Sequence, residues 1–189
     1  MSQAKTKSGH FHAVRFYEDE TSLCRIVSGF IAEGVAARQP ALVIATAMHN
    51  ECILDNLRAS GIDVATLQQN SELLMLDARE MLNQFMEDGL PNPERFLNAA
   101  TAALQCVAGD RSKTIRAYGE MVDLLWKDGS SAASIKVEML WNKLAGTHDF
   151  SLLCGYAMGS FYKDITIDDV CRHHTHRVSD TGETSAVVN

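Results

Sequence analysis

Features that are missing from this 189-residue chain exclude several classes of protein. No run of about 18 apolar residues is present, so the sequence predicts no membrane span. The polar N-terminal stretch MSQAKTKSGHFH lacks the apolar core of a signal peptide, and we expect a cytoplasmic protein. Lys and Arg number 17 against 24 Asp and Glu, which leaves a net charge of −7. Direct binding of nucleic acid, which depends on clustered positive charge, is therefore not expected.

The cysteines also lack the pattern of a disulfide framework. The five of them are scattered along the chain and form no CxxC pair. An odd, dispersed set in a reducing compartment predicts free, buried thiols that behave as small apolar side chains.

The sequence does contain a regular alternation of strand and helix signals. Apolar or alternating segments predict strands at 12–17, 41–45, 73–76, 114–118 and 150–156. Helical spacing predicts helices after a cap at Thr21 or Ser22, and at 48–60, 78–86, 94–107, 120–127, 131–144 and 167–178. This order favours a three-layer α/β/α domain with a mostly parallel central sheet. We expect it to span residues 10–178, between flexible tails at 1–9 and 179–189.

Residues 12–46 are typical of the first strand, helix and strand of a nucleotide-binding α/β domain. A phosphate-binding version carries a glycine-rich loop ending in Gly-Lys-Ser/Thr after the first strand. This chain has Tyr-Glu-Asp-Glu-Thr-Ser at positions 17–22. No glycine lets the backbone wrap an anion there, and three carboxylates replace the lysine. The sequence therefore predicts the scaffold of an ATPase without its hydrolytic chemistry.

Six segments, in order, carry a resemblance to a known family. They are HAVRFYED (12–19), FIAEG (30–34), ALVIAT (41–46), GEMVDLLW (119–126), EMLWN (138–142) and FSLLCGY (150–156). Together they resemble the MEDS family, the sensory domain of methanogen and methylotroph regulators typified by DcmR. The resemblance implies a fold related to RecA and KaiC without a phosphate-binding loop, and a sensor of small hydrocarbon-derived molecules rather than an enzyme. Such domains commonly precede histidine kinase or DNA-binding modules, whereas this sequence contains neither.

A ligand site is expected beyond the carboxyl ends of the strands, where parallel sheets bind ligands. We predict that Tyr17, Glu18, Tyr118, Glu120 and Tyr156 line it. His12 and Trp126 are second choices. Two alternatives remain open: the acids after Tyr17 complement a helix dipole, and Trp126 belongs to the core.

No catalytic residue, cofactor or metal site is predicted. His173, His174 and His176 lie close together near the C-terminal end, and His10 and His12 near the start, but no fourth ligand at a firm spacing completes a zinc site. We interpret them as surface or packing histidines. Cys154 lies in an apolar strand and is expected to be a buried neutral thiol.

The sequence thus favours a non-enzymatic sensor whose partner is a small-molecule ligand. Ligand binding would shift segments around Gly89 or Gly129, and a histidine kinase or transcription regulator would respond, as in a two-component system. Two alternatives stay open: an assembly module that forms homo-oligomers on a degenerate ATPase fold, and a residual nucleotide binder.

Overall fold

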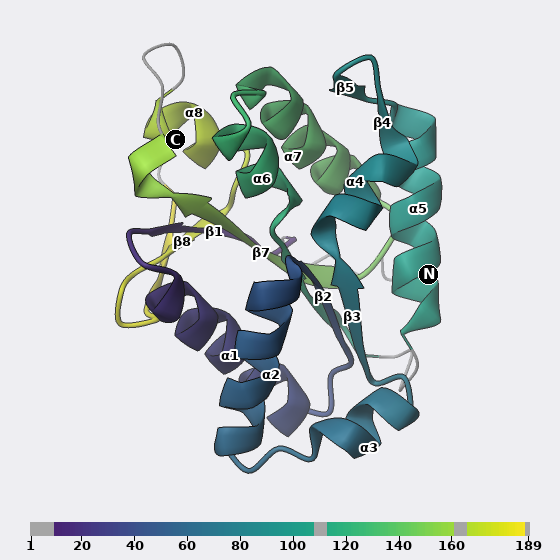
Figure 1. Cartoon of the computed structure of the whole chain (residues 1–189), viewed down its shortest axis with the longest axis vertical. Coiled ribbons are helices and arrows are strands. Elements are labelled where there is room, and N and C mark those ends of the chain that lie inside the picture. The colour runs from purple at the N-terminus through teal and green to yellow at the C-terminus, as the bar shows by residue number, and fades with distance from the viewer. Residues whose placement is uncertain (1–9, 108–112, 161–165, 188–189) are drawn as a thin grey trace, which may run out of the picture.

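A computed structural model describes residues 10–107, 113–160 and 166–187. The tail predicted at 1–9 lies outside these residues. Figure 1 shows a central sheet with helices packed on both of its sides. None of the helices in the described ranges is long and apolar enough to cross a membrane.

The main sheet has seven strands in the order β3-β2-β6-β7-β1-β8-β9. All neighbouring pairs are parallel except β8 and β9. A separate two-stranded hairpin joins β4 and β5. The bounds are β1 (His12–Tyr17), β2 (Ala41–Ala45), β3 (Leu73–Asp77), β4 (Met86–Glu87), β5 (Leu90–Pro91), β6 (Ile115–Gly119), β7 (Phe150–Ala157), β8 (His176–Val178) and β9 (Thr184–Ala186).

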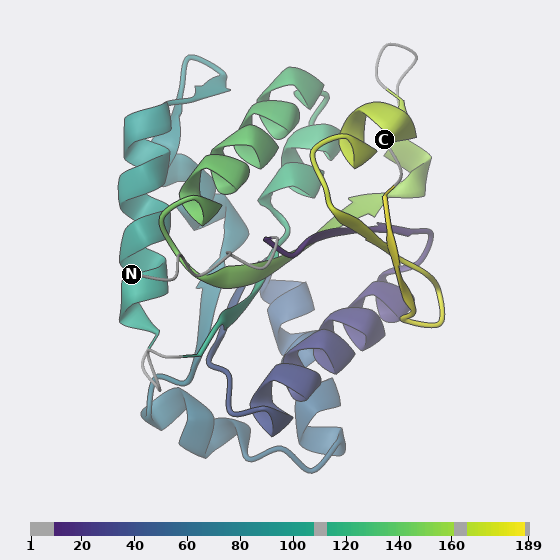
Figure 2. The same cartoon turned by 180° about the vertical axis from the view of Figure 1, so that it is seen from behind.

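The helices divide into two layers, one on each face of the sheet. One face of the sheet packs against α1, α2 and α3 and forms one apolar cluster with them. The other face packs against α4 to α8 and forms a second apolar cluster. Figure 2 shows the same division from behind. The bounds are α1 (Glu20–Ala36), α2 (Ala47–Ala59), α3 (Val64–Gln69), α4 (Ala78–Phe85), α5 (Pro93–Cys106), α6 (Met121–Lys127), α7 (Ser131–Ala145) and α8 (Ile167–Cys171).

The three-layer α/β/α prediction is confirmed, and the five predicted strands are all in the sheet. Two local predictions hold for clear reasons. Asp77 caps α4 by accepting hydrogen bonds from the backbone N–H groups of Arg79 and Glu80. Pro93 occupies the first turn of α5, where its missing N–H costs no hydrogen bond.

Two local predictions are wrong. The cap of α1 is Asp19, whose side chain accepts from the Ser22 N–H, and not Thr21 or Ser22. The last helix ends at Cys171 instead of reaching residue 178. Residues 176–178 instead form β8, which adds to the sheet beside β1. Pairing with the edge of β1 outweighs the weak helical spacing there, and β9 lies within the stretch that the sequence marks as a tail.

Candidate functional site at the carboxyl edge of the sheet

Four strand ends meet at the carboxyl edge of the sheet. Tyr17 ends β1, Thr46 follows β2, Glu120 follows β6 and Ala157 ends β7. The chain leaves β1 and β2 toward the α1 and α2 layer, and leaves β6 and β7 toward the other layer. Two switch points of the topology therefore lie here, between β2 and β6 and between β7 and β1, and such crevices are the usual ligand sites of parallel sheets.

Asp123 is the centre of the first half of this site. Its side chain is fully buried, and Oδ2 accepts a hydrogen bond of 2.6 Å from the Tyr17 hydroxyl. Lys127 Nζ lies 2.9 Å from the same Oδ2 and donates to the Tyr17 oxygen at 2.8 Å. The Ala157 N–H donates to Oδ1 at 2.8 Å. Asp123 thus joins β1, α6 and the end of β7 through one charged group.

Glu120 is the centre of the second half. One of its oxygens accepts from the Thr46 N–H at 2.8 Å, and the other lies 2.8 Å from His49 Nδ1. Both Glu120 and His49 are buried. The hydrogen bond to Glu120 raises the pKa of His49, with burial opposing this and Glu20 adding to it. The pair therefore behaves as a buried ion pair between α2 and the end of β6.

Two polar atoms of the carboxyl-edge site have no hydrogen-bond partner among the described residues. They are the Tyr118 hydroxyl and His49 Nε2, both buried. The nearest acid to His49 Nε2, Glu20, lies 3.9 Å away and is half exposed. Burial, and then Glu120, raises the pKa of Tyr118, so its hydroxyl stays protonated and can donate. Unpaired buried groups cost free energy, which a ligand that hydrogen-bonds to them would recover.

The His49–Glu120 pair predicts a dependence of stability on pH. Because folding raises the pKa of His49, the pair stabilises the protein fully below the unfolded value of 6.5 and loses this contribution as the pH rises through the folded pKa. His49→Gln should therefore lower the free energy of unfolding by about 1–3 kcal/mol in mild acid and by less at alkaline pH. Urea unfolding across pH measures this.

The control for that measurement is the same substitution made in Glu120→Gln protein. Without the carboxylate the pH-dependent part of the His49→Gln effect should disappear. If the effect persists with the same pH dependence, the exposed neighbour Glu20, and not Glu120, raises the pKa of His49.

The structure brings together three of the predicted residues, Tyr17, Tyr118 and Glu120, at this edge. Glu18 also lies there but is exposed in the turn before α1. Tyr156 and Trp126 pack against each other on the opposite face, with ring centroids 5.5 Å apart. His12 lies on that same opposite face, in a cluster described below.

Sequence reasoning did not identify His49, Asp123 or Lys127. A signal for two of them was present: Asp123 and Lys127 are four residues apart on one helix, the spacing of an ion pair. His49 offers no such signal, because only the pairing of β2 with β6 brings α2 beside Glu120.

A second group of buried polar side chains lies under α7 and α8. His12, Glu138, Cys154 and His174 place one nitrogen, oxygen or sulfur atom each within 4.8 Å of one another, and we call them the His12 cluster. His12 and His174 are both buried, so of the two alternatives, surface or packing, the structure fits packing. The sequence did not indicate Glu138 as their common partner.

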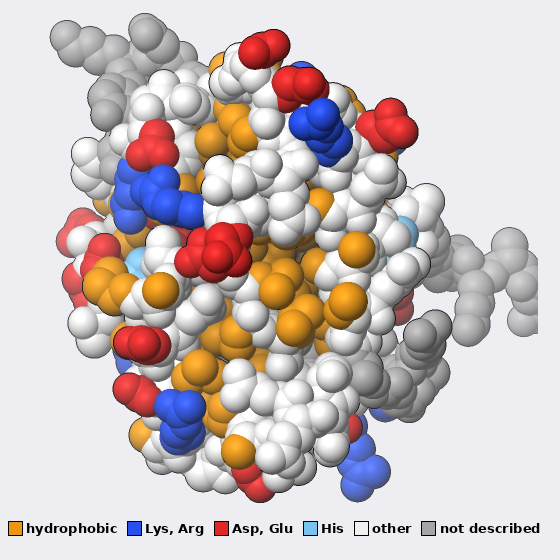
Figure 3. All heavy atoms as spheres, turned by 45° about the vertical axis from the view of Figure 1, so that its right-hand side comes forward, with side chains coloured by type: hydrophobic (Ala, Val, Ile, Leu, Met, Phe, Trp, Pro, Cys, Tyr) orange, Lys and Arg blue, Asp and Glu red, His pale blue; other side chains and the backbone are white. Residues whose placement is uncertain are grey.

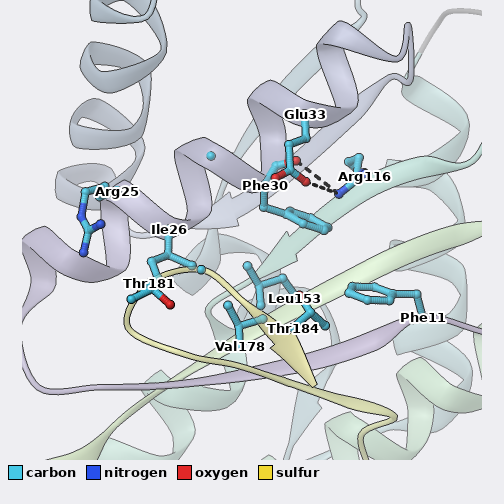
Figure 4. Close-up of a pocket in the computed structure, with 12 residues that line it drawn as sticks. Phe11, Arg25, Ile26, Phe30, Glu33, Arg116, Leu153, Val178, Thr181 and Thr184 are labelled. Carbon is cyan, nitrogen blue, oxygen red and sulfur yellow. Dashed lines mark hydrogen bonds and ion pairs between the residues drawn. The ribbon is translucent and has the colours of Figure 1, made fainter. Parts of the chain in front are cut away.

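A cavity of about 390 Å³ lies away from both groups, between α1 and the β8–β9 hairpin. In Figure 4, Phe11, Ile26, Phe30, Leu153 and Val178 line its apolar part. The Arg116 guanidinium lies 4.7 Å from the centre of the Phe30 ring and 3.6 Å from the Glu33 carboxylate. This cavity is large enough for a small molecule, and nothing in the sequence pattern indicated it.

The comparison with family profiles matches residues 11–175 to MEDS, described as the methanogen/methylotroph, DcmR sensory domain. The chain belongs to the MEDS family. The match covers β1 through the residues just before β8, and therefore both buried polar groups. A comparison with curated proteins returns no match. Membership indicates a sensory role for this MEDS domain.

Proposed function

We propose that this MEDS domain is a non-enzymatic sensor that binds a small hydroxylated molecule at the carboxyl edge of its sheet and signals through a partner protein. The observation that supports this most directly is the pair of unsatisfied polar atoms, Tyr118 Oη and His49 Nε2, within the carboxyl-edge site. The carboxylates of Glu20, Glu120 and Asp123 lie near them, which disfavours a phosphate. A hydroxyl suits the site because it can accept from these two groups and donate to a carboxylate.

Lys127 offers a route from the ligand to the surface. It is 32% exposed, and its ammonium reaches inward to Asp123 and Tyr17 from the last turn of α6. The turn that follows contains Gly129 at φ +77°, and Asp128 there pairs with Arg79 on α4. A ligand that competes for Tyr17 would release Lys127 and shift this turn, and a histidine kinase or transcription regulator would read that change.

Calorimetry with a panel of short alcohols tests the proposal. We expect one of these probes to bind the wild-type protein, and Tyr17→Phe to weaken binding by about 10-fold or more, since it removes one charged hydrogen bond. Phe30→Ala, in the separate cavity, is the matched control and should leave the affinity unchanged. Loss of binding only in Phe30→Ala would place the ligand in the cavity, and binding by no probe would contradict the proposal.

One observation favours assembly as a second function. The edge strand β3 has no strand on its outer side among the described residues, and Leu74, Met75 and Leu76 on it are only half-buried. Figure 3 shows hydrophobic side chains gathered across the middle of the face turned toward the viewer. A stable homo-oligomer in light scattering that dissociates in Met75→Lys and responds to no ligand would favour this function over sensing.

A further inference from the structure

The His12 cluster joins four side chains from separate parts of the fold. His12 lies on β1, Cys154 on β7, Glu138 on α7 and His174 just after α8. Figures 1 and 2 show α7 and α8 on the same side of the sheet. The first three residues are completely buried and His174 is 3% exposed. Buried polar and charged side chains are usually paired with one another or coordinate a metal ion.

Four distances within the His12 cluster are close to the edges of a tetrahedron around a metal ion, with each imidazole facing a different oxygen of Glu138 and all ligand atoms within 4.8 Å of one another. His12 Nε2 lies 3.1 Å from Glu138 Oε2, and His174 Nε2 lies 3.3 Å from Glu138 Oε1. Cys154 Sγ lies 3.5 Å from His12 Nε2 and 3.6 Å from Glu138 Oε2. Bonds of about 2.0 Å to nitrogen and oxygen and about 2.3 Å to sulfur separate ligand atoms by about 3.3–3.6 Å.

Hydrogen bonds outside the cluster orient both imidazoles for coordination. His12 Nδ1 faces the side-chain carbonyl oxygen of Asn142 at 2.9 Å, and His174 Nδ1 faces the Val170 carbonyl at 2.8 Å. The Asn142 amide donates to the His173 carbonyl at 2.8 Å, which fixes which of its atoms faces His12. Since a carbonyl only accepts, each Nδ1 donates its proton to the oxygen that it faces, and Nε2 is then the ring atom that faces the cluster. Metal-binding histidines have this arrangement.

Glu138 is held in place in the same way. The Tyr156 hydroxyl donates to Oε1 at 2.8 Å, and Ser134 lies 3.1 Å from that hydroxyl. The carboxylate therefore faces the Nε2 atoms of both imidazoles, and His174 Nε2 has no hydrogen-bond partner among the described residues. A buried carboxylate needs positive charge beside it, which a proton on an Nε2 or a metal ion among these atoms supplies.

We propose that His12, Glu138, Cys154 and His174 bind one Zn²⁺-class divalent cation. One thiolate and one carboxylate balance the charge of the ion, and the two imidazoles are neutral, so the complete site carries no net charge in the core. Cys154 loses its proton to solvent as the bond from Sγ to the metal forms. Four protein ligands leave no open position, which is typical of a structural rather than a catalytic zinc site.

A metal ion in the His12 cluster would also affect the β8–β9 hairpin. His174 is followed by Thr175, whose N–H and hydroxyl both donate to the His12 carbonyl, at 2.7 and 3.0 Å. β8 begins at the next residue and pairs with β1. A metal bound to His12 and His174 would therefore fix the start of the hairpin that covers the cavity, and it acts independently of the carboxyl-edge ligand.

Cobalt substitution tests the proposal. Full-length protein is stripped with a chelator under reducing conditions and titrated with Co²⁺, whose bond to a thiolate produces a charge-transfer absorption band. We expect one equivalent of Co²⁺ to bind with this band, and Zn²⁺ to displace it. Cys154→Ser should lose the band, and His174→Gln should weaken binding by about 10-fold or more.

The matched controls are Cys106→Ser, on the exposed side of α5, and His173→Gln, the neighbour of His174. Both should bind Co²⁺ as the wild type does. The proposal is overturned if the folded wild-type protein, checked by circular dichroism, shows no thiolate band, or if the band survives in Cys154→Ser. Because this test uses unsubstituted protein first, a variant that fails to fold does not decide it.

Discussion

Replacing Trp126 with alanine is expected to lower the free energy of unfolding by about 3–5 kcal/mol. The side chain is completely buried on α6, and its ring meets the Tyr156 ring edge-on at 5.5 Å. Truncation would leave a cavity that the rigid sheet beneath cannot close. Urea unfolding followed by circular dichroism measures the loss, since tryptophan fluorescence itself changes with the substitution.

Met139→Ala is the control for Trp126, because Met139 is 55% exposed on the adjacent helix α7. Its substitution should change the free energy of unfolding by no more than about 0.5 kcal/mol. A small loss of stability in Trp126→Ala, together with altered binding of a small molecule, would contradict the core role of Trp126. It would support the prediction that Trp126 lines the ligand site.

Asp123→Ala is expected to cost about 3–5 kcal/mol of stability, because it removes one partner of a buried charge. Lys127, the Tyr17 hydroxyl and the Ala157 N–H would all lose the acceptor they share. Asp123→Asn keeps an oxygen for the Ala157 N–H and should cost less. Thermal and urea unfolding of the two variants compare the loss of the charge with the loss of the whole group.

Asp55→Ala is the matched control for this second prediction. Asp55 also pairs with a cation, Arg58, at 2.8 Å, but it is 75% exposed, and such surface pairs contribute between 0 and about 1 kcal/mol. Equal losses in Asp123→Ala and Asp55→Ala would mean that water reaches Asp123, and the carboxyl-edge site would then be open rather than closed by Lys127.

The sequence predicts the sheet well because its long strands are rich in apolar residues. Ala41–Ala45 is apolar throughout, and it is covered by helices on both faces as this pattern requires. The prediction fails near the end of the chain because the three residues of β8 have no periodicity of their own. Pairing with β1 decides their conformation instead.

The site is predicted only in part, because strand ends can be read from sequence but side-chain faces cannot. Tyr17 is the last residue of β1 and Tyr156 the last but one of β7, so Tyr156 lies beside Phe16 and points to the face opposite Tyr17. The predicted set therefore divides between the carboxyl-edge site and the region of the His12 cluster. Whether a ligand contacts any of these residues stays a prediction.

The strand order also determines how late in translation the central sheet can form. The first strand, β1, has only β7 and β8 as neighbours, and His12 lies opposite Leu152. A ribosome that adds 5–20 residues per second takes on the order of 10 s to deliver that partner. β1 has no strand to pair with during this interval, so we expect newly made chains of this protein to need chaperone protection more than a protein built from local hairpins.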